Sequence, residues 1–152
     1  VAAAHASVRA DCAYIDSTAM HLVKAPWDFD VMLTENAFGG ILSDLAAGLV
    51  GSIGLAPSAD IGDRHAVFQP AHGSAPDIAG KGIANPVGQI LSAALMLDWL
   101  ADRHGEPRLA HGARIIERAV ERALTTIRPV EFGGKDGTPA ITKAIITQIR
   151  KE

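Results

Sequence analysis

The sequence has only one cysteine, Cys12, so no disulfide can form within the chain. Its formal net charge is −3, with acidic and basic residues interspersed, and it lacks the basic stripe that a nucleic-acid backbone requires. It has no leader-like start, and its longest apolar stretch, residues 41–57, is shorter than the roughly 20 residues that span a bilayer. We therefore expect a soluble protein of a reducing cytoplasm, with neither a nucleic-acid nor a membrane partner.

The chain starts at Val1 rather than at a methionine, and its 152 residues, 48% of them hydrophobic, are enough for one ordinary core. Apolar runs predict strands at residues 13–15, 29–34 and 66–68, with a loop at 56–63. Helical periodicity and N-terminal signals predict helices that start near residues 17, 37, 86, 107 and 138. This alternation is typical of the α/β class. Because a doubly wound sheet usually has more strands, we expect an upstream part of a longer protein to supply them.

The most informative segment is the loop from Pro70 to Pro86, called the 70–86 loop below, which connects a predicted strand to a predicted helix. It is dense in Gly, Ser, Asp and Asn. In open α/β sheets ligands bind beyond the carboxyl ends of strands, where backbone N–H groups and a helix N-terminus are available. The loop lacks the Gly-x-Gly-x-x-Gly pattern of an ordinary dinucleotide turn. Its composition alone leaves open whether it binds a nucleotide or merely connects two elements.

The order of residues in this loop is more specific than its composition. Residues 68–86 read Phe-Gln-Pro-Ala-His-Gly-Ser-Ala-Pro-Asp-Ile-Ala-Gly-Lys-Gly-Ile-Ala-Asn-Pro, which closely resembles the isocitrate and isopropylmalate dehydrogenase family. The similarity extends back to residue 14 and forward to residue 94. It implies the C-terminal part of the family's two-domain α/β subunit. Residues 1–50 would belong to the smaller, dimer-forming domain, and residues 51–152 would complete the larger, cofactor-binding domain.

Carried over residue by residue, the resemblance predicts that the loop binds the adenosine half of NAD. Asn85 and backbone groups would contact the adenine, and Asp77 would accept hydrogen bonds from both ribose hydroxyls. A carboxylate there would repel the 2′-phosphate of NADP, so NAD is the expected cofactor. Without the surrounding match, Asp77 is better explained as a turn-forming residue after Pro76. The predicted cofactor-binding residues are His72, Gly73, Ser74, Ala75, Pro76, Asp77, Ile78 and Asn85.

The resemblance also implies a divalent cation, Mg²⁺ or Mn²⁺, bound by Asp16 and Asp44, with Asp16 reaching the site of the other subunit. Oxygen ligands suit such hard cations. The family usually has a further Asp four residues before Asp44, where this chain has Gly40, so we expect weaker metal binding. Considered without the resemblance, Asp44 is equally well explained as an Asp on an otherwise apolar helix face, and Asp16 as a helix cap.

The implied reaction is the oxidative decarboxylation of a 2-hydroxy acid with an adjacent carboxylate, of the isopropylmalate, isocitrate or homoisocitrate type. Tartrate is an alternative substrate. The family's catalytic lysine and tyrosine and its substrate-binding arginines would lie upstream of Val1. We therefore expect no catalytic residue in this chain, which alone would be inactive, and a homodimer or higher homo-oligomer for the whole protein. Two residues depart from the family pattern, Gly40 and Gln69, and Gln69 stands where the family usually has Glu. They leave open the alternative that the protein is a noncatalytic NAD-binding or regulatory subunit.

Overall fold

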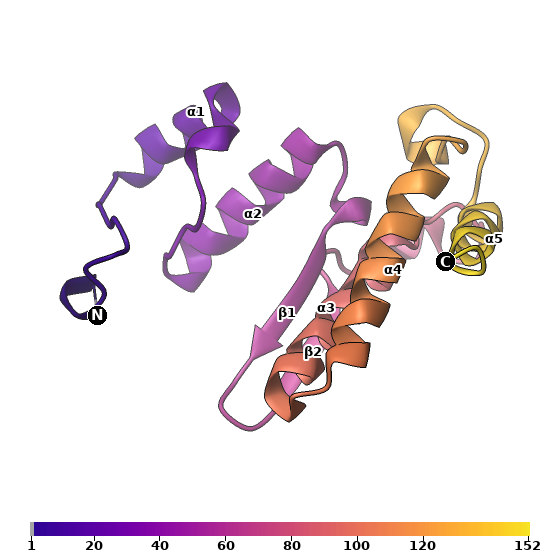
Figure 1. Cartoon of the computed structure of the whole chain (residues 1–152). Helices are drawn as coiled ribbons and strands as arrows, with labels where there is room; N and C mark the ends of the chain where they lie inside the picture. Colours follow the sequence, from indigo (N-terminus) through magenta and orange to yellow (C-terminus); the bar gives the residue numbers. More distant parts are fainter. Residues whose placement is uncertain (1) are drawn as a thin grey trace. The chain divides into compact units, whose positions relative to one another are not determined.

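The computed structural model describes residues 2–152 and divides the chain into two compact units, one ending at Leu49 and one running from Val50 to Glu152 (Figure 1). Helices α1 (Ile15–Lys24) and α2 (Asn36–Val50) dominate the first unit, with short 3₁₀ turns η1 (Ala2–Ala4) and η2 (Pro26–Asp28). The second unit contains η3 (Ile53–Leu55), β1 (Pro57–Ile61), β2 (Ala66–Pro70), η4 (Pro76–Ile78), α3 (Val87–His104), α4 (Pro107–Leu124), η5 (Val130–Phe132) and α5 (Thr138–Ile149). The roles predicted for residues 1–50 and 51–152 stay predictions.

Helix α1 starts where side-chain hydroxyls bind its first carbonyl group. Ser17 Oγ and Thr18 Oγ1 both donate to the carbonyl oxygen of Tyr14, at 2.9 and 2.8 Å. The helix ends at Lys24, two residues before Pro26, because proline cannot continue the hydrogen-bond ladder. The prediction of a strand at residues 13–15 is wrong, since Ile15 is already the first residue of α1.

The predicted strand at residues 29–34 is also absent from the described part of the chain. Val31 and Leu33 are 89% and 97% exposed, so neither side chain packs against the first unit. A strand is stabilised by hydrogen bonds to a neighbouring strand and by side-chain packing on its faces. Among the described residues no strand pairs with this segment, and the side chains of Val31 and Leu33 lack packing partners.

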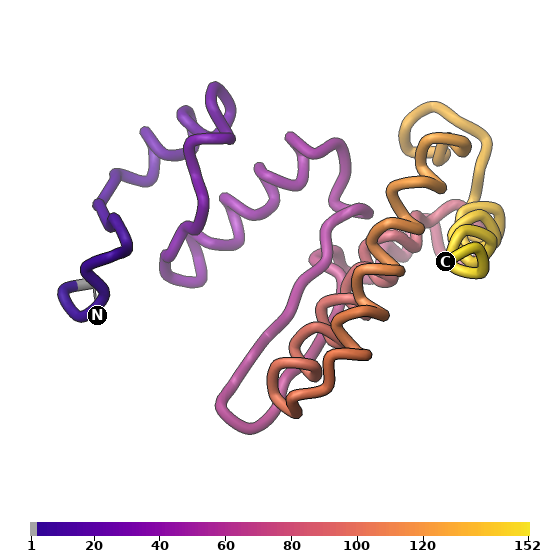
Figure 2. Tube along the Cα trace, viewed as in Figure 1, coloured from indigo at the N-terminus to yellow at the C-terminus, as the bar shows by residue number. Residues whose placement is uncertain are grey.

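The second unit contains the only sheet among the described residues, a two-stranded antiparallel hairpin that is easily followed in Figure 2. Pro57 lies opposite Pro70, and Ile61 lies opposite Ala66. Strand β2 contains the predicted run 66–68. The prediction of a loop at 56–63 is wrong, because five of these residues form β1 by pairing with β2 and by packing on α3.

The core of the second unit lies among three helices. Helix α3 packs against both strands and against α4, and α4 packs in turn against α5 (Figure 1). Ala119 and Ala123 on α4 are fully buried, and such small side chains let helices approach closely. The buried cluster consists of Val87, Ala119, Val120, Ala123, Ile141 and Ile145.

Gly88 brings the start of α3 close to the backbone that precedes β1. A Cβ atom at this position would lie 3.0 Å from the carbonyl oxygens of both Gly54 and Ala56. Only glycine fits this approach without a backbone shift. None of the described helices combines the length and the apolar character that a membrane crossing would need.

Candidate functional site

The second unit contains a cavity of about 800 Å³ beside the 70–86 loop. The loop contributes most of its wall, η3 and η5 contribute residues from elsewhere in the chain, and Thr138 and Pro139 at the start of α5 complete it. Of the predicted cofactor-binding residues, the ones that line the cavity are His72, Gly73, Ser74, Ala75, Ile78 and Asn85. Pro76 and Asp77 do not line it, and Asp77 is exposed.

The start of the 70–86 loop takes its shape from one residue with an unusual backbone. Ala71 N–H donates to the carbonyl oxygen of Ala56 at 3.0 Å, which keeps the loop against the hairpin. Ala75 then has φ = +43°, the only positive φ of a non-glycine residue in the described chain. This left-handed conformation is strained for a residue with a Cβ atom, and such strain concentrates at functional sites. The η4 turn that follows puts Ile78 in the cavity wall.

The end of the loop is held by the N-terminus of α5. Thr138 N–H donates to the carbonyl oxygen of Gly82 at 2.8 Å, and Thr138 Oγ1 donates to the carbonyl oxygen of Ala84. Gly137 makes this contact possible, because a Cβ atom there would lie only 2.3 Å from the carbonyl oxygen of Gly82. The position of the loop therefore depends on α5.

Asn85 closes the loop and lies 8% exposed at the start of α3. Its Oδ1 accepts a hydrogen bond from Val87 N–H at 3.1 Å, and its Nδ2 donates to Glu131 Oε1. A backbone N–H only donates and a carboxylate only accepts, so these two partners determine which end of the amide is oxygen and which is nitrogen.

Glu131 is a residue of this site that the sequence reasoning did not identify. Its Oε2 accepts a hydrogen bond from Ser52 Oγ at 2.5 Å, and Ser52 Oγ itself accepts from Gly54 N–H at 2.9 Å. Among the residues that line the cavity, Glu131 is the only carboxylate, and none is a lysine or arginine. Its two partners lie 79 and 46 positions away in the sequence, so no local pattern indicates the contact.

The predicted metal ligands lie in the first unit, and both are exposed. Asp16 Oδ1 accepts a hydrogen bond from Ser17 N–H at 2.8 Å, which is the local role of a residue in the first turn of a helix. Residues 2–152 contain no group of three or more His, Cys, Asp or Glu side chains arranged to hold a metal ion. At Gly40 a Cβ atom would meet nothing within 4 Å, so the carboxylate that the family usually has at this position would fit.

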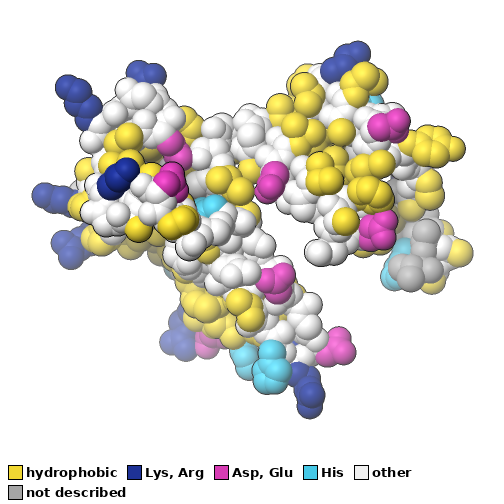
Figure 3. Space-filling model, turned by 180° about the vertical axis from the view of Figure 1, so that it is seen from behind, with side chains coloured by type: hydrophobic (Ala, Val, Ile, Leu, Met, Phe, Trp, Pro, Cys, Tyr) yellow, Lys and Arg dark blue, Asp and Glu magenta, His cyan; other side chains and the backbone are white. Residues whose placement is uncertain are grey.

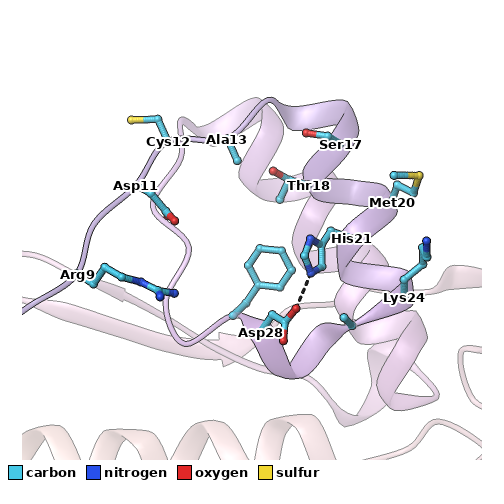
Figure 4. Close-up of a pocket in the computed structure, with 12 residues that line it drawn as sticks. Arg9, Asp11, Cys12, Ala13, Ser17, Thr18, Met20, His21, Lys24 and Asp28 are labelled. Atoms are coloured by element: carbon cyan, nitrogen blue, oxygen red, sulfur yellow. Dashed lines mark hydrogen bonds and ion pairs between the residues drawn. The ribbon is translucent and has the colours of Figure 1, made fainter.

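A second cavity, of about 810 Å³, lies within the first unit between α1, η2 and the segment that precedes α1. Figure 4 shows His21 of α1 and Asp28 of η2 pointing toward each other, with His21 Nε2 2.7 Å from Asp28 Oδ2. The His21 ring also meets Phe29 edge-on, with centroids 5.3 Å apart. These contacts join η2 to α1, and each partner is half exposed.

Residues 1–149 match the family described as isocitrate/isopropylmalate dehydrogenase. The chain is 52% identical over 137 residues to an isocitrate/homoisocitrate dehydrogenase of Thermus thermophilus, covering 90% of this chain and 39% of that protein. It is 46% identical over 149 residues to a homoisocitrate dehydrogenase of Methanocaldococcus jannaschii, covering 97% and 41%. A β-decarboxylating dehydrogenase structure from Thermococcus kodakarensis matches with a TM-score of 0.82 at 43% identity, covering 98% and 42%. The chain spans about two fifths of the length of these proteins.

Proposed function

Because the chain belongs to the isocitrate/isopropylmalate dehydrogenase family, we propose that its second unit binds the adenosine half of NAD in the cavity beside the 70–86 loop. We propose further that the whole protein catalyses NAD-dependent oxidative decarboxylation of a 2-hydroxy acid with an adjacent carboxylate. The observation that carries the proposal is the coincidence of the resembling loop with the cavity, since most of the residues predicted from the family line its wall.

The chemistry of the cavity supports a nucleoside rather than a phosphate as its occupant. No lysine or arginine lines it, and its one carboxylate would repel a phosphate group. Loop backbone and small side chains form much of the wall, which leaves room for a flat base. A volume of about 800 Å³ also lies in the range of roughly 300–1,000 Å³ that ligand pockets occupy. The pyrophosphate of NAD would then lie outside this cavity.

Asp77 supports NAD over NADP as the cofactor. It is exposed and lies next to Ile78, a residue of the cavity wall. A 2′-phosphate near its carboxylate would meet a repulsion of about 1 kcal/mol per unit charge at 4 Å in water, and several times more in a less polar environment. The two free hydroxyls of the NAD ribose avoid this repulsion and can donate to the carboxylate instead.

The residues proposed for the metal are Asp16 and Asp44. Both are exposed carboxylates, which suit a hard cation, and Mg²⁺ commonly uses only one or two protein carboxylates. The cation, when bound, would polarise the oxygen atoms of the substrate and stabilise the negative charge left by decarboxylation. We propose that the proton-transferring and substrate-clamping residues lie outside these 152 residues, so that this chain binds and orients rather than transferring protons itself.

We propose that the exposed surface of the first unit packs against other parts of the whole protein and against a second copy of it. Large hydrophobic side chains are exposed over this unit (Figure 3). Exposed apolar patches of this kind mark protein interfaces. The most exposed members are Val8 at 64%, Tyr14 at 84%, Trp27 at 77%, Val31 at 89% and Leu33 at 97%.

Two measurements test the proposed function. Isothermal titration of this chain with NAD tests the cofactor site, and the formation of NADH from isocitrate, homoisocitrate or isopropylmalate with Mn²⁺ tests the activity of a longer polypeptide that contains the chain. Binding of NAD together with turnover of at least one of the acids is the expected result. A chain that does not bind NAD would refute the cofactor site.

The second candidate function is a noncatalytic NAD-binding or regulatory subunit, which Gly40 favours because a metal carboxylate is lacking at that position. Gln69 gives less support, because its Nε2 donates to Asp60 Oδ2 at 3.2 Å across the hairpin and the residue does not line the cavity. Nucleotide binding without turnover of any of the acids would favour this second function.

A further inference from the structure

Glu131 lies outside the 70–86 loop, yet its carboxylate joins two other parts of the cavity wall. Ser52 Oγ donates to Oε2 at 2.5 Å, and Asn85 Nδ2 donates to Oε1. Ser52 precedes η3, and Asn85 precedes α3, so the carboxylate connects the starts of two helical elements. Both oxygen atoms of Glu131 are thus committed to hydrogen bonds within the protein.

The contact with Glu131 restricts the amide of Asn85 to one orientation. If the amide were turned over, Oδ1 would face the acceptor Glu131 Oε1 and Nδ2 would face the donor Val87 N–H. Both contacts would then be repulsive, so the reversed amide is disfavoured twice. In the observed orientation, Nδ2 retains one further N–H and Oδ1 retains one further lone pair. Asn85, which lines the cavity, therefore has one donor and one acceptor left, in a defined order.

We propose that Glu131 is a positioning residue that makes this site selective for adenine over hypoxanthine. The inference rests on the proposed function, namely that the cavity binds the adenosine half of NAD. Adenine presents an N6–H donor beside the N1 acceptor, which complements Oδ1 and the second N–H of Asn85 Nδ2. Hypoxanthine presents the reverse order, with an O6 acceptor beside an N1–H donor. Against a fixed amide, the O6 acceptor of hypoxanthine faces the acceptor Oδ1, and its N1–H donor faces the donor Nδ2. An amide that is free to turn over can bind either base.

If Glu131 had only a structural role, a different result would be expected from its removal. If Glu131 only joined η3 to α3, its removal would loosen the cavity and weaken the binding of both dinucleotides by the same factor. If Glu131 orients Asn85, its removal changes the ratio of the two affinities. The ratio is therefore the informative quantity, and it is insensitive to a general loss of stability.

The experiment compares the dissociation constants of NAD and nicotinamide hypoxanthine dinucleotide for this chain by isothermal titration. The unaltered chain is expected to prefer NAD by about tenfold or more, because Asn85 is buried and both its donor and its acceptor would meet mismatched groups of hypoxanthine. Glu131→Ala is expected to bring the ratio within about threefold of one. Glu121→Ala, which removes an exposed glutamate of α4, is the control and should keep the full preference.

A second variant keeps the test informative if Glu131→Ala fails to fold. Glu131→Gln has the same shape, but its amide can donate as well as accept, so it tolerates either orientation of Asn85. The preference for NAD should fall severalfold in this variant. An unchanged ratio in the folded variants, with NAD still bound, would overturn the role of Glu131 and leave the proposed function intact. If the unaltered chain bound neither dinucleotide, both the proposed function and this inference would fail.

Discussion

Replacing Gly137 with alanine would push a methyl group into the backbone of the 70–86 loop. The new Cβ atom would lie 2.3 Å from the carbonyl oxygen of Gly82. Non-bonded carbon and oxygen atoms need more than 3 Å, so the loop and the start of α5 must separate by about 1 Å. The backbone of Gly137 itself is extended, with φ = −87° and ψ = −178°, which alanine adopts readily. The effect of the substitution therefore comes from the contact and not from the dihedral angles.

The cost of this separation can be worked out from the contacts that it breaks. Forcing a methyl group into a close backbone contact costs about 1–3 kcal/mol. Moving α5 away also weakens the two hydrogen bonds from Thr138 to the loop, each worth about 1 kcal/mol. The free energy of unfolding of the second unit should thus fall by about 2–5 kcal/mol. For a unit of this size each kcal/mol lowers Tm by about 4–8 °C, so a loss of roughly 10 °C or more is expected.

The assay is thermal unfolding followed by circular dichroism, paired with titration of NAD below Tm. Because Gly82 and Thr138 line the cavity, the displaced loop should also weaken NAD binding by tenfold or more. Gly112→Ala is the matched control, since its new Cβ atom would meet only Leu97 Cδ1, at an ordinary 3.6 Å, in the interior of α4. That change should leave stability equal or slightly higher. A Gly137→Ala chain as stable as the control would refute the dependence of the loop on α5.

Three further predictions concern single charged groups. Asp77→Lys should weaken NAD binding and relatively favour NADP, because the repulsion of a 2′-phosphate becomes an attraction; an unchanged preference in a titration would rule out this role for Asp77. Gly40→Asp, which places a carboxylate one helical turn before Asp44 where a Cβ atom meets nothing, should tighten Mn²⁺ binding in the assembled protein. Equal Mn²⁺ affinity before and after the change would contradict a metal-binding role for this position. The hydrogen bond from Arg108 lowers the pKa of Glu106, so the capping contribution of this carboxylate is complete above its unfolded pKa and is lost as pH falls through the lower folded pKa. Arg108→Ala should move the Glu106 pKa upward in an NMR titration, and a pKa that stays low would show that Arg108 is not the cause.

The helices could be predicted from the sequence because their signals are local. Apolar positions at helical spacing and the prolines at positions 86, 107 and 139 put all five helices within two residues of their observed starts. The strands could not be predicted in this way. Residues 29–34 have a strong apolar pattern but no partner among the described residues, whereas β1, with alanine, serine and aspartate, becomes a strand through its partner β2.

The residues of the candidate site also differ in whether the sequence could identify them, because some are adjacent in the sequence and others are distant. The resemblance of the 70–86 loop indicated most of one cavity wall, because those residues are adjacent in sequence. Glu131 could not be found by this route, since a glutamate between Pro129 and Gly133 is indistinguishable from an ordinary turn residue until the fold brings it to Asn85.

The two carboxylates near the proposed adenosine site, Asp77 and Glu131, therefore have separable tasks. Asp77 is exposed, lies outside the cavity wall and makes no hydrogen bond among the described residues, so its carboxylate is available to ribose hydroxyls. Glu131 lines the cavity, but both of its oxygens are engaged by Ser52 and Asn85, so it acts on a ligand through Asn85. The preference for NAD over NADP and the preference for adenine over hypoxanthine would then be altered by different substitutions. A change at Asp77 should alter the ratio of NAD to NADP affinity and leave base preference intact, and a change at Glu131 should do the reverse.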